Sequence, residues 1–120
     1  MKETKTIEKG WGREVIFANT EDYCGKLMIF DNPGDKGSMH FHLKKDESWF
    51  IAKGSFIVRW IDTTSARTLE HKLVVGDIWR NRPGEPHQLE ALEKDSVVYE
   101  VSTHDDPNDS LRVMPGTGQK

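Results

Sequence analysis

The chain is 120 residues long, with a mass of 13.8 kDa and a formal net charge of −3 that comes from 17 Lys and Arg against 20 Asp and Glu. This length predicts a single domain, and the near balance of charge argues against nucleic-acid or membrane-surface partners, which need a clustered basic excess. Apolar runs reach four residues, as in 27–30, whereas a membrane span needs roughly 20; the lone Cys24 and the absence of a secretory signal predict a cytoplasmic protein.

Short runs rich in Val, Ile, Phe, Trp and Thr alternate with Gly, Pro, Asn and Asp along most of the chain. Such runs predict many short strands, and no helix of convincing length is visible. In chain order, the expected strands are 13–18, 25–30, 39–42, 47–53, 55–61, 67–74, 77–81, 87–92 and 97–103. This spacing is typical of an all-β sandwich or small barrel.

The predicted organisation is one domain over residues 1–120, with a barrel core at about 25–104. An N-terminal strand segment, 1–24, precedes this core. The tail, 105–120, is rich in Pro and Gly and is expected to be irregular, although Leu111, Val113 and Met114 could dock on the body.

Histidines carry the main chemical signal. His40 and His42 are two positions apart in an expected strand, so both imidazoles leave the same face. Glu47 begins the next strand, and His87 begins a later one. Three imidazoles and a carboxylate on neighbouring strand ends suit a divalent first-row metal (Zn, Mn, Fe, Ni or Co), so we expect convergence on one point, with metal–nitrogen distances of about 2.0–2.2 Å.

Two blocks of spacing contain these residues. The first consists of Gly34, five residues, His40-x-His42, four residues, Glu47, six residues and Gly54; the second consists of Gly76-Asp77, Pro83-Gly84 and His87. Together they resemble the two motifs of the cupin superfamily, with one extra residue before Pro83 and Ala91 in place of a closing Asn. The resemblance implies a jelly-roll antiparallel β-barrel, metal ligation by His40, His42, Glu47 and His87, and a homodimer.

Further short pieces are similar to the cupin half of type II mannose-6-phosphate isomerases. They are 8–12, Glu47-Ser48-Trp49, 99–103 and 111–113. This resemblance implies a sugar or sugar-phosphate ligand. The arginines of those enzymes are replaced here by Leu43 and Gln88, so Lys44, Lys45 or Arg80 would have to recognise a phosphate.

Candidate ligand contacts each have a plainer alternative. Trp49 and Trp79 could stack on a sugar ring or pack in the core. Gln88 could bond a ligand or the barrel rim, and Lys45 and Arg80 could bind an anion or lie solvated at the surface.

The sequence leaves three functions open. The first is a metal-dependent isomerase or epimerase acting on a small carbohydrate-like substrate. The second is a non-catalytic cupin that binds a sugar or another polar small molecule, and the third is an Fe(II) dioxygenase. We also expect exposed apolar surface, and hence a homodimer, because apolar residues occur at 57, 60 and 61 and in the expected strand 13–18.

Overall fold

The structure is a computed structural model that describes residues 3–120. Within this range the chain forms eleven strands and no helix. They are β1 (Lys5–Lys9), β2 (Gly12–Asn19), β3 (Cys24–Phe30), β4 (Met39–Phe41), β5 (Glu47–Lys53), β6 (Ser55–Ile61), β7 (Thr68–Val74), β8 (Ile78–Asn81), β9 (His87–Ala91), β10 (Ser96–Ser102) and β11 (Leu111–Met114). The nine expected strands coincide with β2 to β10 to within one residue at either end, so the all-β prediction is confirmed.

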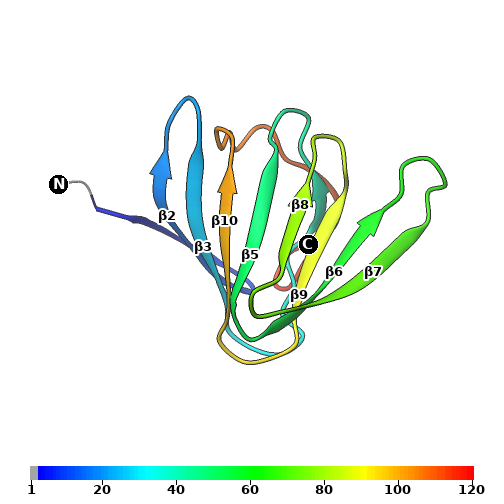
Figure 1. The fold of residues 1–120 in the computed structure, drawn as a ribbon, viewed down its shortest axis with the longest axis horizontal. Helices are drawn as coiled ribbons and strands as arrows, with labels where there is room; N and C mark the ends of the chain where they lie inside the picture. Colours follow the sequence, from blue (N-terminus) through cyan, green and yellow to red (C-terminus); the bar gives the residue numbers. More distant parts are fainter. Residues whose placement is uncertain (1–2) are drawn as a thin grey trace.

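The strands form two antiparallel sheets that face each other (Figure 1). One sheet has the order β1-β2-β3-β10-β5-β8, and the other has the order β11-β4-β9-β6-β7. The β6–β7 hairpin splays away from the remaining strands at one side of the molecule. Residues that are far apart in the chain therefore become neighbours, such as β3 beside β10 and β4 beside β9.

Alternation along the strands fills the space between the sheets with apolar side chains. Trp11 stacks on Phe30, with ring centroids 4.2 Å apart, and Phe30 meets Phe56 edge-on at 5.2 Å. Ile51 and Val98 are fully buried in the same cluster. Among residues 3–120, no helix is long and apolar enough to cross a membrane.

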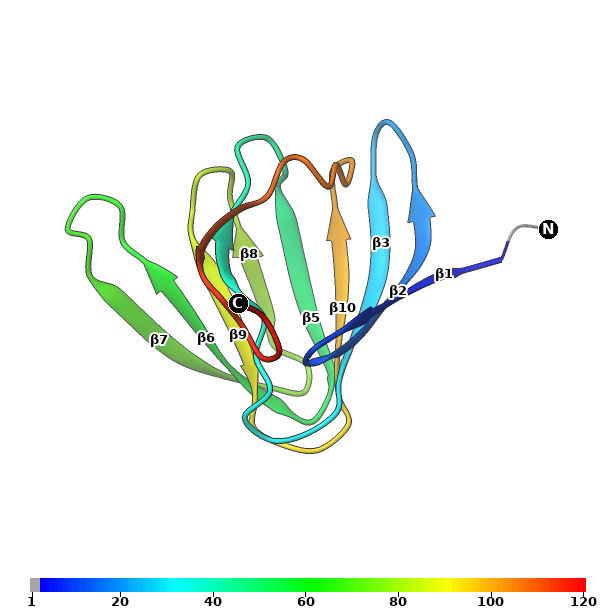
Figure 2. The same ribbon diagram turned by 180° about the vertical axis from the view of Figure 1, so that it is seen from behind.

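The expectation of an irregular tail is wrong for residues 111–114. This segment forms β11, which pairs with the edge of β4, and Leu111 lies opposite Phe41. The prolines and glycines that suggested irregularity flank the strand and do not interrupt it. Beyond β11, the Thr117 N–H donates to the Lys36 carbonyl at 2.8 Å, which ties the chain end to the body (Figure 2).

A close backbone approach joins the two ends of the described chain. A Cβ atom added at Gly10 would lie 2.0 Å from the carbonyl oxygen of Thr117, a distance that no side chain tolerates. The turn between β1 and β2 can therefore pack against residues 117–118 only because position 10 is glycine. The terminal segments thus cover one side of the barrel together.

Candidate metal centre

Four side chains that the sequence singled out lie together between the sheets. His40 is in β4, His42 directly follows it, and His87 is the first residue of β9, where it pairs with His40. Glu47, the first residue of β5, comes from the opposite sheet. One ligand atom from each residue lies within 4.8 Å of the other three. We call these four residues the metal cluster.

Backbone carbonyls fix the tautomer of each imidazole. Nδ1 of His40 lies 2.9 Å from the Ser38 carbonyl oxygen, and Nδ1 of His87 lies 2.8 Å from that of Glu85. His42 makes the same type of contact. A carbonyl oxygen can only accept, so each Nδ1 must carry the proton that it donates. Each neutral ring therefore keeps the lone pair on Nε2, the atom left available to a metal.

The C-terminal segment supplies the carbonyl that holds His42. It belongs to Asp109, whose carboxylate also accepts hydrogen bonds from the backbone N–H groups of Leu43, Lys44 and Lys45 at 2.7, 3.1 and 3.1 Å. Asp109 therefore shapes the loop between β4 and β5 and orients the ring that precedes it.

Glu47 provides the test of whether these residues fit a metal. Its Oε1 lies 2.9 Å from Nε2 of His87 and 3.2 Å from Nε2 of His42. With both Nδ1 atoms protonated, this oxygen faces two lone pairs. Among the described residues, neither Glu47 Oε1 nor His87 Nε2 has a hydrogen-bond donor or acceptor that satisfies it. Acceptors arranged in this way need a positive charge between them, either a proton on one ring or a metal ion, and a set of three imidazole nitrogens and one carboxylate oxygen fits a divalent transition metal.

Protonation of the cluster reflects the same geometry. Burial, reinforced by His87, lowers the pKa of His40 to about 3 and keeps this ring neutral. Burial alone would lower the pKa of His42, but hydrogen bonds to Glu47 and to the Asp109 carbonyl raise it overall. In the metal-free protein, His42 thus holds a proton more readily than an isolated imidazole does. Burial opposes ionisation of Glu47, yet the neighbouring Glu100, His42 and His87, which can donate protons to its carboxylate, hold its pKa well below the usual range.

A second group of charges lies beside the metal cluster. We call it the ion cluster; it consists of Glu14, Lys26, Lys45, Glu100 and Asp105. Nζ of Lys45 lies 3.0 Å from both Glu100 and Asp105, while Nζ of Lys26 lies 3.5–3.7 Å from the three acidic residues. Burial and the nearby charge of Glu47 raise the pKa of Glu100 to about 7.

Lys45 and Arg80 are both engaged by carboxylates, Lys45 beside the metal cavity and Arg80 outside it. Lys45, which the sequence suggested as a solvated turn residue or an anion contact, is only 4% exposed, and its ammonium group is held in the ion cluster. Alternation could not reveal this, because Lys45 lies in a loop. Arg80 is exposed and donates to Asp46 through Nη2 at 2.6 Å, on the outside of the barrel. Lys44 is exposed as well.

The metal cluster opens into a cavity of about 440 Å³. Its apolar wall includes Trp11, Phe30 and Leu89. Polar side chains also line it, among them Ser38, Ser110, Gln119, Lys9 and Arg112. A cavity with one apolar wall and several hydroxyl and amide groups suits a small polar molecule that also has an apolar face.

Trp49 lines this cavity, whereas Gln88 does not. Trp49 is buried, meets His87 edge-on at 5.5 Å and donates from Nε1 to Glu100 at 3.1 Å. Trp49 therefore packs in the core and also borders the cavity. Gln88 is also buried, but it donates to the Gly37 carbonyl at 3.0 Å, on the opposite face of β9 from His87.

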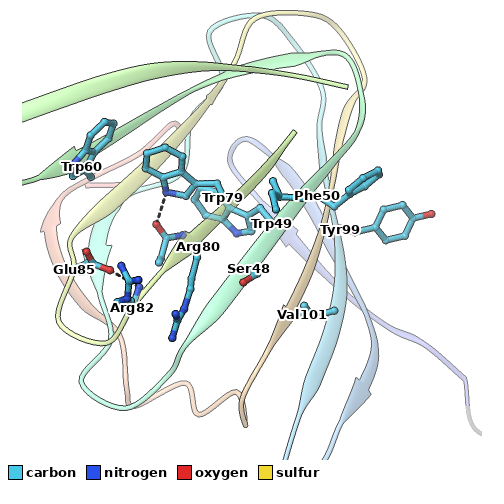
Figure 3. A pocket seen from close by; sticks show the side chains of 12 residues that line it. Ser48, Trp49, Phe50, Trp60, Trp79, Arg80, Arg82, Glu85, Tyr99 and Val101 are labelled. Carbon is cyan, nitrogen blue, oxygen red and sulfur yellow. Dashed lines mark hydrogen bonds between the residues drawn. The ribbon is translucent and has the colours of Figure 1, made fainter. Parts of the chain in front are cut away.

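Trp79 lies at a different pocket. It packs against Trp60, with ring centroids 4.8 Å apart, and donates to Asn81 at 3.0 Å (Figure 3). This second pocket, of about 620 Å³, also receives Arg80. Trp79 and Arg80 are therefore separated from the metal cluster, and a ligand in the metal cavity would not contact them.

Sequence reasoning missed the contributions of the chain ends. Asp109 and Arg112 lie in the segment that was expected to be irregular, and Lys9 precedes the first expected strand. The spacing of the two motifs contains no information about them. The one available signal was the short apolar alternation at residues 111–114, which predicts a strand only if a partner edge is known.

No family model matches the chain, and no curated protein matches it in sequence. Solved structures do match. The capsular polysaccharide assembling protein CapF from Staphylococcus aureus is similar over 95% of this chain and 35% of its own, with a TM-score of 0.83 and 20% identity. Oxalate decarboxylase from Bacillus subtilis is similar over 92% of this chain and 30% of its own, with a TM-score of 0.79 and 24% identity.

The formate complex of Lactobacillus farciminis oxalate decarboxylase gives a TM-score of 0.78 at 22% identity, covering 92% of this chain and 34% of that one. The chain thus spans about a third of the length of each of these proteins. They have the cupin fold, and the predicted cupin jelly-roll antiparallel β-barrel is confirmed.

Proposed function

We propose that this protein is a metal-dependent cupin that binds and transforms a small carbohydrate-like molecule, as an isomerase or epimerase does. One observation carries the proposal: three imidazole Nε2 atoms and an unsatisfied carboxylate oxygen converge at the wall of a cavity. His40, His42, Glu47 and His87 would hold a divalent first-row metal ion (Zn, Mn, Fe, Ni or Co).

The residues of the cavity define how such a ligand would be held. Trp11 and Phe30 offer an apolar wall to one face of a sugar ring, and Ser38, Ser110 and Gln119 offer partners to its hydroxyl groups. A bound divalent ion supplies Lewis-acid polarisation of a ligand oxygen. The carbonyls of residues 38, 85 and 109 keep the Nε2 atoms directed at that position.

Metal analysis and ligand screening test the proposal. Untagged protein purified without added metal should contain close to one first-row ion per chain by elemental analysis. Sugars with vicinal hydroxyl groups should then raise the melting temperature of the metal-loaded protein and leave that of the stripped protein unchanged. An equal rise in stripped protein would show that the cation is structural and would overturn the proposed role.

A non-catalytic binding role is the second candidate. It is favoured by the ion cluster, because Lys26, Lys45, Glu100 and Asp105 are engaged with one another and are not free to act on a ligand. Turnover of sugars or sugar phosphates separates the two roles. The third function, an Fe(II) dioxygenase, is distinguished by the identity of the bound metal and by oxygen consumption.

A homodimer is part of the proposal. Large apolar side chains are exposed on the outer face of β5 and β10: Phe50 (45%), Tyr99 (45%) and Val101 (62%) (Figure 3). Ile78 (76%) lies opposite Phe50 in the neighbouring β8 and is exposed as well. This surface differs from the expected one, because Trp60 turns inward against Trp79. Sedimentation at micromolar concentration should give twice the chain mass, and a charge introduced by Ile78→Asp should shift the protein to monomer.

A further inference from the structure

The C-terminal segment places the side chain of Arg112 at the metal cavity, and this cation has no partner among the described residues. Arg112 lies in β11 directly opposite His40 in β4. Residues that face each other across an antiparallel pair project to the same side, with Cβ atoms about 4.5–5.5 Å apart. The Arg112 side chain therefore leaves the sheet on the side of the metal cluster, and it lines the same cavity.

The Arg112 guanidinium differs from the two buried lysines of the cavity in its partners. Lys26 and Lys45 also line the cavity, and both are held by carboxylates. Within residues 3–120, no carboxylate oxygen lies within 4.0 Å of the Arg112 guanidinium, and that group makes no hydrogen bond. Its donors remain available to an incoming molecule.

Lys9 adds a second available charge to this side of the cavity. It ends β1 and lines the cavity, and it too lacks an ion pair in the described part of the chain. The contact of Gly10 with Thr117 and Gly118 holds this end of β1 against the C-terminal segment that follows β11. Two exposed cations without partners in the described chain, Lys9 and Arg112, thus lie at the border of one cavity.

We propose that Arg112, assisted by Lys9, forms an anion subsite for a phosphate or carboxylate group of the ligand. The proposal rests on the proposed function, because the remaining oxygens of the same ligand would face the metal cluster. A guanidinium offers N–H donors in a planar fork that matches the oxygens of either anion. This assignment differs from the sequence expectation, in which Lys44, Lys45 or Arg80 took that role, and it narrows the ligand to an anionic carbohydrate-like molecule.

Calorimetric titration of three matched probes tests the subsite: a hexose, its 6-phosphate, and the corresponding uronic acid. Metal-loaded wild-type protein should bind at least one charged probe about tenfold or more tightly than the hexose, since hydrogen bonds to charged groups are strong. Arg112→Gln should remove that preference while leaving hexose affinity and metal content unchanged. Arg112→Lys should keep part of it. The stronger of the two charged probes identifies phosphate or carboxylate as the group recognised.

Arg67→Gln is the matched control, because Arg67 is an exposed arginine that lies outside the cavity and forms no ion pair with any described residue. An unchanged preference in Arg112→Gln, or an equal loss in Arg67→Gln, would overturn the subsite while leaving the metal proposal intact. If wild-type protein binds no metal, the proposed function is overturned, but the anion subsite can still be tested. Inorganic phosphate titrated into metal-free wild-type and Arg112→Gln protein still decides the subsite: weaker binding by the variant supports it, and equal binding or none by both overturns it.

Discussion

The metal cluster and the ion cluster lie side by side in one cavity, and their charges are satisfied in opposite ways. In the ion cluster, each ammonium group faces carboxyl groups at 3.0–3.7 Å, so the cluster is complete within the chain. In the metal cluster, the oxygen of Glu47 faces the lone pairs of His42 and His87. The ion cluster has its counter-charges within the chain and can stabilise the fold by itself. The metal cluster lacks a counter-charge among the described residues and is suited to bind a cation from outside.

This difference predicts how each cluster responds to the loss of one member. Removing a member of the ion cluster leaves an uncompensated buried charge and lowers the stability of the fold itself. Removing a member of the metal cluster reduces the repulsion between acceptor atoms that face one another. Such a change should therefore lower metal affinity and leave the stability of the metal-free fold largely unchanged.

The largest expected effect is that of Lys45→Ala on the metal-free protein. The change leaves the buried carboxyl of Glu100 without its 3.0 Å partner, and breaking a buried pair in this way costs about 3–5 kcal/mol. Denaturant unfolding monitored by tryptophan fluorescence would measure it. Lys44→Ala is the matched control, because its side chain is exposed and should change the free energy of unfolding by less than about 0.5 kcal/mol. Equal effects would contradict the description of the ion cluster.

His87→Ala should remove the stabilisation that metal provides. A ligand at 100 times its dissociation constant stabilises a fold by about 2.7 kcal/mol, and the variant should lose this increment together with its bound metal. Unfolding with and without added Mn²⁺ or Zn²⁺, combined with elemental analysis, would show it. His71→Ala should behave as wild type, because His71 lies outside the metal cluster and stacks on Trp79. Stoichiometric metal in His87→Ala would exclude this residue as a ligand.

The two clusters also differ in how far the sequence could reveal them. Period-two alternation puts His40 and His42 on one face, and the spacing to Glu47 and His87 matches a known motif, so the metal cluster could be predicted residue by residue. The ion cluster joins residues 14, 26, 45, 100 and 105, which meet only through the sheet order β2-β3-β10-β5 and the loops around it. Local pattern contains no information about that order.

A signal for the ion cluster was nevertheless present. Lys26 shares its strand face with Met28 and Phe30, and Glu100 shares its face with Val98, so alternation alone placed two charges among core residues. A buried charge requires a partner, which could not be identified before the strands were paired. The role of β11 escaped prediction for a similar reason, because its pairing depends on an edge of β4 about 70 residues earlier in the chain.

A smaller effect, on metal affinity, should follow from Asp109→Ala. This variant tests whether residues outside the metal cluster help to position its ligands. The side chain accepts three backbone N–H groups of the loop that carries His42, and its own carbonyl orients that ring. The carbonyl remains in the variant, but the carboxylate that holds it against the loop of His42 is lost. Displacing an outer partner of a metal ligand should lower metal affinity by up to the 10–100-fold typical of losing one, or about 1.4–2.7 kcal/mol. Competition with a coloured chelator would measure the change. Asp106→Ala provides the control, since among residues 3–120 its carboxylate accepts only from the backbone of Asn108. A similar loss of metal affinity in this variant would contradict the role assigned to Asp109.

The smallest effect concerns pH and the metal-free protein. His40 has a pKa of about 3 in the folded chain, against 6.5 when unfolded, so only the unfolded state gains its proton as pH falls below 6.5. Linkage then lowers stability by about 1 kcal/mol between pH 6.5 and 5.5 through this residue. The raised pKa values of His42 and Glu100 act in the opposite direction, because the folded state takes up their protons first. The diagnostic quantity is therefore the difference between the pH profiles of wild type and His40→Gln. The free energy of unfolding of wild type, relative to that of His40→Gln, should decrease progressively as pH falls. Parallel profiles for the two proteins would show that the pKa of His40 is not lowered in the fold.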